Sequence, residues 1–381
     1  MVPFSFCKKY LKNKHTLFTI LKKCDKINTN WRGGYTIMIG QNIKYYRLKK
    51  DLTKKALASA VGLSAMAITN YEQGKRVPDI ATLRKLAHEL DVQIADFIST
   101  RNDNIQFTHG EFRKNLSLNE SQQEYIKEAV EEYFNRFFNA VMCVGEKSLP
   151  APIKCHELIS TGYADEDAKK IRGILGISLE GPVKELVAIL ENKGILIFEL
   201  DYANEGFSGM NGKVNEYPYI VINKNMSSER KRSTIAHELV HMVFLDINDS
   251  KENEKYAAAV SGALLIGDSD IKRELGWQRR AITNDMLIVC REYGISMWLL
   301  VVRAAQTNII STTTAQDFYV KASKAGWRKN EPSRISAEEP TLFKQLVYRA
   351  INEENISIQK GAELLKIPYE TVLDECRLME V

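Results

Sequence analysis

The sequence predicts a multidomain protein in which a compact all-α unit precedes an α+β domain and a mostly helical C-terminal region. Its 381 residues exceed the roughly 100 to 200 residues of one typical domain. Five short helical patterns fill residues 41–98, punctuated by Gly62, Gly74 and Pro78. From about Pro182, helical and strand patterns alternate instead. We therefore divide the chain into the ranges 1–37, 38–99, 100–150, 151–283 and 284–381.

Positive charge is concentrated at the N-terminal end of the chain. Residues 1–37 carry a net charge of +7 and residues 38–99 one of +4, whereas the whole chain carries only +5. The N-terminal quarter is thus suited to bind the phosphate groups of nucleic acid, and the rest of the chain need not touch nucleic acid. Residues 1–37 show no helical or strand period, so that we expect either a disordered basic arm or an over-called start before Met38.

The cysteines and the apolar runs exclude several classes of protein. The six cysteines are scattered without any C-x-x-C pair, which predicts reduced thiols in a cytoplasmic protein and neither a disulfide framework nor a thiolate zinc cluster. No apolar run approaches the roughly 18 residues of a membrane span. We therefore expect neither an anchor nor a secretory signal.

The all-α unit, residues 38–99, contains the spacing of a helix-turn-helix. Thr53 can cap a helix in which Ala58 is small enough for a second helix to cross closely. Gly62 supplies the turn, and Ser64 can cap a second helix that buries Ile68. The opposite face of this second helix is then free for a partner.

That free face predicts contacts with DNA. Asn70 can pair bidentately with adenine. The short or apolar side chains that can touch thymine methyl groups are Ala65, Met66 and Thr69. The cations that would position the helix through phosphates are Lys54, Lys55, Lys75 and Arg76. We expect a double-stranded DNA operator as partner; the alternative is a helical domain used only for pairing or protein contact.

The following segments predict the elements of the second domain. An aromatic stripe at spacings of three and four makes Asn119–Met142 an amphipathic helix, either an interdomain helix or a dimer seam. The further expected elements are a helix at Val183–Glu191, strands at Gly194–Leu200 and Tyr219–Asn223, and helices at Ser227–Phe244 and Ser250–Ile266. Near the C-terminus, residues 362–372 have a weak helix-turn-helix rhythm without a basic cluster, which favours helical packing or dimerisation.

The run His237-Glu238-Leu239-Val240-His241 predicts a zinc site. Residues four apart lie on one face of a helix, so that His237 and His241 can bind one Zn²⁺. Glu238 lies beside that metal and is placed to act as general base on a bound water, the chemistry of amide hydrolysis. The alternative is a pair of surface histidines on an ordinary amphipathic helix.

A catalytic zinc usually has a third protein ligand. Glu252 fits a capping box with Asp249 as N-cap, which predicts a structural role. Glu254 instead shares a face with small and apolar residues that would let its helix lie close to the histidine helix. We therefore expect Glu254 to complete the ligand set.

Both the helix-turn-helix and the zinc motif resemble known protein families. The order and spacing of residues 53–78, including Tyr71-Glu72-Gln73-Gly74-Lys75, resemble the repressor/Cro (XRE-type) class of helix-turn-helix domains, although Lys54 stands where that class usually has Gln. The runs that resemble ImmA/IrrE-type metallopeptidases fused to such a domain are residues 232–241, 254–257, 264–265, 293–297 and 326–332. Three positions depart from that pattern. Ser233 stands where these peptidases usually have an aromatic residue, Val240 where they usually have Gly, and Gly267 where they usually have Pro. The bulk of Val240 beside His241 would either tighten the packing or narrow the cleft.

The second resemblance implies a zincin-like fold and a cytoplasmic regulator whose peptidase relatives cleave helix-turn-helix repressors. We expect a DNA-binding transcriptional regulator with an active zinc endopeptidase that cleaves a repressor-type protein. One alternative is a DNA-binding repressor or antitoxin-like sensor whose peptidase-like domain hydrolyses nothing. Another is a protease that uses the helix-turn-helix to dock its substrate. Homodimerisation is compatible with each of them.

Overall fold

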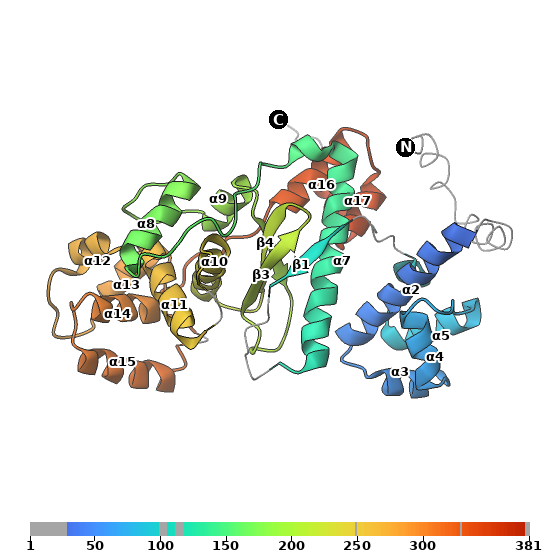
Figure 1. Ribbon diagram of the computed structural model, residues 1–381, viewed down its shortest axis with the longest axis horizontal. Coiled ribbons are helices and arrows are strands. Elements are labelled where there is room, and N and C mark those ends of the chain that lie inside the picture. The colour runs from blue at the N-terminus through green and yellow to red at the C-terminus, as the bar shows by residue number, and fades with distance from the viewer. Residues whose placement is uncertain (1–28, 99–104, 111–117, 248–249, 328–329, 378–381) are drawn as a thin grey trace. The chain divides into compact units, whose positions relative to one another are not determined.

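The computed structural model describes residues 29–98, 105–110, 118–247, 250–327 and 330–377, and it divides into two compact units (Figure 1). Unit 1 comprises the chain up to Arg101 together with Glu120–Glu128, and unit 2 comprises Asn102–Asn119 and Ala129–Val381. The prediction of an all-α unit followed by an α+β domain and a helical C-terminal region is confirmed. Among the described residues, no helix combines the length and the apolar character that crossing a membrane requires.

Unit 1 is a bundle of helices around an apolar core. Its helices are α2 (Thr29–Lys49), α3 (Lys54–Val61), α4 (Ala65–Glu72), α5 (Ile80–Leu90) and α6 (Ile94–Phe97). Each contributes to the core, and the side chains with no exposed surface include Ile43, Leu57, Ile68, Leu86 and Phe97. Helix α2 begins at Thr29, so the prediction that the chain lacks helical structure before Met38 is wrong for the residues from 29 onward. The rest of the predicted arm, residues 1–28, lies outside the described residues.

The predicted caps and turn of the helix-turn-helix are confirmed. The hydroxyl of Thr53 accepts a hydrogen bond from Ala56 N, and that of Ser64 accepts one from Ala67 N, both at 3.1 Å. Gly62 ends α3 with φ 72°, a left-handed conformation that side chains other than glycine's rarely adopt. Ala58 is 1% exposed, as expected where α4 crosses α3.

Unit 2 contains a four-stranded mixed sheet. Its strands are β1 (Phe107–His109), β2 (Leu196–Leu200), β3 (Gly209–Val214) and β4 (Tyr217–Asn223). They lie in the order β1-β3-β4-β2, in which β3 is antiparallel to both neighbours and β2 is parallel to β4. The sequence predicted β2 and β4, whereas β1 lies in the range 100–150, for which only a helix was predicted, and β3 was not anticipated.

Helices cover both faces of this sheet (Figure 1). Ile220 and Ile222 of β4 belong to the hydrophobic core that includes α10 (Ser228–Val243). Tyr219, on the opposite face, meets Phe134 of α7 (Glu120–Val144), with ring centroids 5.0 Å apart. All residues of β4 are consequently buried, which explains why its sequence is a continuous apolar run.

The aromatic stripe of α7 is buried by the chain itself. Its first nine residues belong to unit 1, where Tyr125 stacks on Tyr45 at 6.2 Å. In unit 2, Tyr133 stacks on Phe198 of β2 at 3.9 Å. The stripe therefore packs against this chain, which favours the predicted interdomain helix over the dimer seam.

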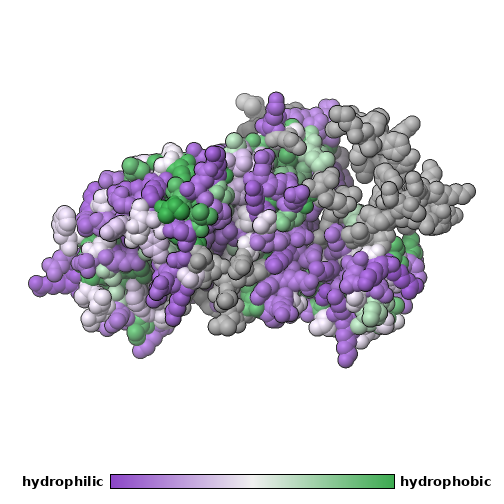
Figure 2. Space-filling model, viewed as in Figure 1, coloured by the Kyte–Doolittle hydropathy of each residue, from purple (hydrophilic) through white to green (hydrophobic). Residues whose placement is uncertain are grey.

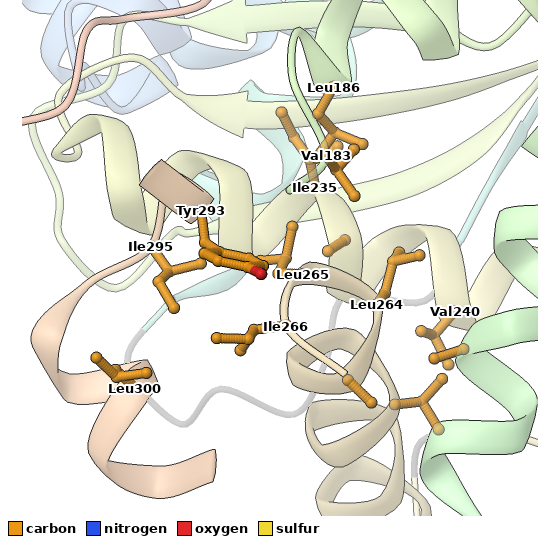
Figure 3. Packing of buried hydrophobic residues seen from close by; sticks show 14 of the residues in the cluster. Val183, Leu186, Ile235, Val240, Leu264, Leu265, Ile266, Tyr293, Ile295 and Leu300 are labelled. Atoms are coloured by element: carbon orange, nitrogen blue, oxygen red, sulfur yellow. The ribbon is translucent and has the colours of Figure 1, made fainter. Parts of the chain in front are cut away.

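Helices supply most of the remaining large core of unit 2 (Figure 3). Its helices are α8 (Ala164–Leu175), α9 (Leu186–Asn192), α10, α11 (Lys251–Leu265), α12 (Asp268–Leu275), α13 (Met286–Tyr293), α14 (Met297–Gln306) and α15 (Thr312–Lys324). A short 3-10 helix, Glu146–Ser148, follows α7. The cysteines within the described residues, Cys143, Cys155, Cys290 and Cys376, are free thiols.

The C-terminal helices α16 (Leu342–Asn352), α17 (Ile358–Leu365) and α18 (Tyr369–Glu375) repeat the spacing of the N-terminal helix-turn-helix. Ser357 caps α17, and Lys366 ends it in the left-handed conformation at φ 55°. Lys366 also pairs with Glu132 of α7 at 2.9 Å. Burial would raise the pKa of Glu132, but Arg136 and Lys366 lower it to about 2. This contact favours the packing role that the sequence suggested for the region.

Candidate metal centre and DNA-binding helices

Helices α10 and α11 carry the candidate metal ligands, and both begin at serine caps. The hydroxyl of Ser227 accepts a hydrogen bond from Arg230 N, and that of Ser250 accepts one from Asn253 N at 3.2 Å. The N-cap of α11 is therefore Ser250, and the prediction of Asp249 as N-cap is wrong. Asp249 itself lies outside the described residues. Glu252, its predicted partner in a capping box, lies exposed in the first turn.

The three predicted ligands converge. The Nε2 atoms of His237 and His241 are 3.1 Å apart. The carboxylate of Glu254 lies 3.5 Å from Nε2 of His237 and 3.1 Å from Nε2 of His241. In a tetrahedral site with zinc bonds of about 2.0 to 2.1 Å, neighbouring ligand atoms lie roughly 3.3 to 3.4 Å apart. The donor types and their spacing therefore fit Zn²⁺.

The surroundings orient these ligands. Nδ1 of His241 lies 3.4 Å from the carbonyl oxygen of Ile247, a contact that favours the tautomer with a free lone pair on Nε2. The side chains of His237 and His241 are 12% and 7% exposed, whereas that of Glu254 is 29% exposed. The site is thus most open to solvent on its α11 side.

Small and apolar residues let α11 approach α10. On the face of α11 that carries Glu254, Ala257, Ser261 and Leu264 are all buried, as the sequence predicted. Val240 of α10 has no exposed surface and lies in the hydrophobic core with Leu264 (Figure 3). Its extra bulk therefore contributes to packing in the core and does not project into a cleft.

Glu238, the predicted general base, is 2% exposed. Its Oε2 accepts a hydrogen bond from Nδ2 of Asn211 on β3 at 2.9 Å. The strand lies this close because of Gly209, where an added Cβ would lie 2.6 Å from Thr234 Cγ2. Sequence reasoning missed Asn211 because β3, with its two glycines, shows no strand pattern.

The start of α10 is anchored by buried charged groups that the sequence did not reveal. Arg232 is 4% exposed, and its guanidinium donates to the carbonyl oxygens of Gly294 at 2.8 Å and Val183 at 2.6 Å and to the carboxylate of Glu338. Burial lowers the pKa of Arg232 to about 10. Glu229 accepts from Ser333 Oγ at 2.7 Å. The segment before α16 is therefore tied to the helix that carries the candidate metal ligands.

In unit 1, α4 presents the predicted DNA-contact face. Met66 is 67% exposed and Ala65 is also exposed, while Ile68 on the opposite face is fully buried. Asn70 and Thr69 are partly exposed, and the hydroxyl of Thr69 donates to Ala65 O at 2.9 Å, within its own helix. The flanking cations that are exposed are Lys55, Lys75 and Arg76.

A buried ion pair holds α4 in place. Arg47 of α2 donates to Glu72 through Nε at 2.5 Å and Nη2 at 3.0 Å, and both side chains are almost fully buried. Its Nη1 also donates to Leu52 O at 2.8 Å, just before α3. Nζ of Lys54 lies 3.7 Å from the same carboxylate. Lys54, the residue that departs from the repressor/Cro pattern, is therefore drawn toward the end of α4.

Models of known protein families match both the helix-turn-helix and the region of the candidate metal centre. The helix-turn-helix family model matches residues 43–97. A peptidase family model described as the IrrE N-terminal-like domain matches residues 190–304, which include the three candidate ligands. No solved structure matches the chain.

Several bacterial and phage-derived regulators are similar to part of the chain. An uncharacterized HTH-type transcriptional regulator of Bacillus subtilis, YqaE, is 34% identical over 80 residues, which are 21% of this chain and 68% of that protein. The cryptic phage CTXphi transcriptional repressor RstR of Vibrio cholerae is 30% identical over 90 residues, 23% of this chain and 81% of the repressor. The SPbeta prophage-derived regulator YonR of Bacillus subtilis is 31% identical over 85 residues, 22% of this chain and 72% of that protein. The chain therefore belongs to the HTH-type transcriptional regulators of the repressor/Cro (XRE) class, and it carries in addition an IrrE N-terminal-like domain.

Proposed function

We propose that this regulator is also a zinc-dependent endopeptidase that cleaves a repressor-type protein. The observation that carries the proposal is the convergence of His237, His241 and Glu254, whose donor atoms lie 3.1 to 3.5 Å apart. Glu238 follows His237 on the same helix, as the general base of such a site does. The resemblance to ImmA/IrrE-type peptidases supports a repressor-type substrate.

The chemistry would be hydrolysis of a peptide bond. Zinc held by the three side chains would supply Lewis-acid polarisation and would lower the pKa of a bound water. Glu238 accepts a proton from the attacking water and returns it to the nitrogen of the leaving amine as the C–N bond breaks. The carbonyl carbon gains the water oxygen, so that one product ends in a carboxylate and the other begins with an amine.

Two variants test the ligand set and the base separately. Wild-type protein should hold about one zinc per chain, whereas Glu254→Ala, which removes the third ligand, should lose it; stoichiometric zinc in the variant would exclude Glu254. Glu238→Gln should keep the zinc and lose cleavage, measured on the chain itself and on repressor-type proteins by mass spectrometry. Cleavage at the wild-type rate by Glu238→Gln would exclude Glu238 as the base.

For the DNA-binding half, we propose an operator read by Ala65, Met66, Thr69 and Asn70 of α4. Phosphate contacts would come from Lys54, Lys55, Lys75 and Arg76, and a homodimer would place two copies of α4 on half-sites about 34 Å apart. Footprinting at the promoter of the chain's own gene tests this proposal. Replacing Asn70 by Ala should relax the preference for one DNA sequence. Removing a phosphate contact should instead weaken binding to all DNA sequences alike.

A second candidate function is a repressor or antitoxin-like sensor whose IrrE-type domain binds a ligand or partner without hydrolysing anything. It is favoured by the similar proteins, which are transcriptional regulators and a repressor. Operator binding by a zinc-loaded protein that cleaves neither itself nor any repressor-type protein would support this candidate. An intact operator footprint also separates both candidates from a protease that uses the helix-turn-helix only for docking.

A further inference from the structure

A side chain on the sheet holds the carboxylate of Glu238. Asn211 is 27 residues away in the sequence, and its Nδ2 lies 2.9 Å from Glu238 Oε2. A carboxylate can only accept hydrogen bonds, so the amide nitrogen of Asn211, and not its oxygen, must face Glu238. Because Glu238 is 2% exposed, water does not compete strongly for this bond.

The backbone of Asn211 is itself fixed by Gly110, the residue that follows β1. Its backbone oxygen accepts a hydrogen bond from Gly110 N at 3.0 Å. A Cβ at position 110 would lie 2.5 Å from that oxygen and 3.2 Å from Oδ1 of Asn211. Only glycine therefore allows this approach, and the backbone of Asn211 is held by the residue that follows β1.

The other oxygen of Glu238 also lies beside β3. An added Cβ at Gly209 would be 3.5 Å from Glu238 Oε1. The strand thus borders both carboxylate oxygens, one through the amide of Asn211 and the other through the backbone at Gly209. The direction of this carboxylate is determined by the sheet as well as by α10.

We infer that Asn211 is a positioning residue for Glu238, which holds the carboxylate in the orientation needed to accept the proton of the attacking water. The inference rests on the proposed peptidase function. An isosteric Asp at this position cannot donate and would place a like charge beside Glu238. An Ala would remove the hydrogen bond that Asn211 Nδ2 donates to the carboxylate. Both substitutions act on the base and leave the three metal ligands in place.

The test uses acetohydroxamate, a bidentate metal ligand whose proton needs an acceptor beside the metal, titrated into the zinc-loaded full-length chain. Asn211→Ala should raise the Kd of acetohydroxamate about tenfold, as expected for loss of a hydrogen bond to a charged group. Asn211→Asp should raise this Kd further. Glu238→Gln should weaken it at least tenfold. The double variant Asn211→Ala, Glu238→Gln should bind no more weakly than Glu238→Gln alone, because Asn211 acts only through Glu238.

Asn225→Ala is the matched control. Asn225 makes the same kind of bond at the same length, from Nδ2 to Asp201 Oδ1 at 2.9 Å, on the exposed surface. Its replacement should leave zinc content and acetohydroxamate affinity unchanged.

Three results would overturn the inference: wild-type affinity in Asn211→Ala while Glu238→Gln is weakened, additive losses in the double variant, or loss of zinc from Asn211→Ala. The predicted pattern together with no peptide cleavage in any assay would support the positioning role and defeat the peptidase proposal alone. Wild-type protein that takes up no zinc would defeat both.

Discussion

Helix α4, which carries the proposed DNA contacts, and helix α10, which carries two proposed metal ligands, make opposite use of their surroundings. Helix α4 has eight residues and presents an exposed face that includes Met66, while only its inner face is buried. Helix α10 has sixteen residues, and its functional side chains Glu238 and His241 are themselves buried. Base contacts need open side chains that a scaffold holds from behind. Metal and proton chemistry needs side chains held on several sides, so more distant residues take part in the site.

Each helix is nevertheless held by one buried arginine. Replacing each of these arginines in turn tests the comparison most strongly. Arg47 anchors the end of α4 through Glu72, and Arg232 anchors the start of α10 through Glu338 and two carbonyl oxygens. Arg47→Met and Arg232→Met each take the arginine away from a carboxylate, which costs about 3 to 5 kcal/mol in buried pairs.

We expect the two losses to be separate. Arg47→Met should abolish the operator footprint and leave one zinc per chain, whereas Arg232→Met should lower zinc content and leave operator affinity unchanged. Hydrogen exchange, measured on peptides from each unit, should show faster exchange only in the unit that carries the substitution. Loss of both activities in either variant would show that the units do not fold independently.

A smaller effect is expected at Val240, where the related peptidases usually have Gly. Val240→Gly removes a fully buried side chain, which contributes about 1.5 to 3 kcal/mol, and adds the roughly 1 kcal/mol cost of a helical glycine. The free energy of unfolding of unit 2 should therefore fall by about 2.5 to 4 kcal/mol, measured by urea denaturation. Because Val240 packs into the core, acetohydroxamate affinity should stay within about twofold of the wild type. A large gain in affinity would show that Val240 narrows the cleft.

The same contrast explains what could be predicted from the sequence. In α3 and α4, caps, turn and buried positions lie within about twenty residues, so Thr53, Gly62 and Ser64 were all assigned correctly. The spacing of His237, His241 and Glu254 is similarly local, because it depends on two successive helices. Asn211 could not be found in this way, since the bond to Glu238 depends on the register of β3.

Two errors have equally specific causes. Asp249 and Ser250 are both good capping residues, and only the backbone shows that Ser250 occupies the cap. The strand β1 consists of three residues in a polar segment, Phe107–His109, too short to show alternation. Its pairing with β3 stabilises it, and a single sequence gives no measure of such pairing.

An ion pair outside both functional helices gives a pH-dependent prediction. The pKa of Glu132 is lowered to about 2 from an ordinary value of 4.5 by Arg136 and Lys366. A depressed pKa of this kind contributes stability that is fully present above about pH 5 and is lost as the pH falls toward 2. At neutral pH, Glu132→Gln should cost about 2 to 3 kcal/mol, measured as faster hydrogen exchange in α16–α18. The difference from the wild type should shrink at pH 3, and a difference that is constant with pH would contradict the shifted pKa.

The smallest expected effect concerns Lys54, which stands where repressor/Cro domains usually have Gln. Its Nζ lies 3.7 Å from the carboxylate of Glu72, which Arg47 already neutralises, and its side chain is 43% exposed. A lysine placed in this way can still reach a phosphate, because its own side chain is partly exposed and Glu72 keeps its bond to Arg47 when Lys54 moves away. If it does so, Lys54→Gln should reduce the slope of log Kd against log salt by about 0.9, the contribution of one phosphate contact to B-DNA. Lys55→Gln is the matched control, since Lys55 is exposed on the same turn of α3. A reduced slope in Lys55→Gln and an unchanged slope in Lys54→Gln would show that Lys54 remains with Glu72 in the complex and serves to hold α4 in place.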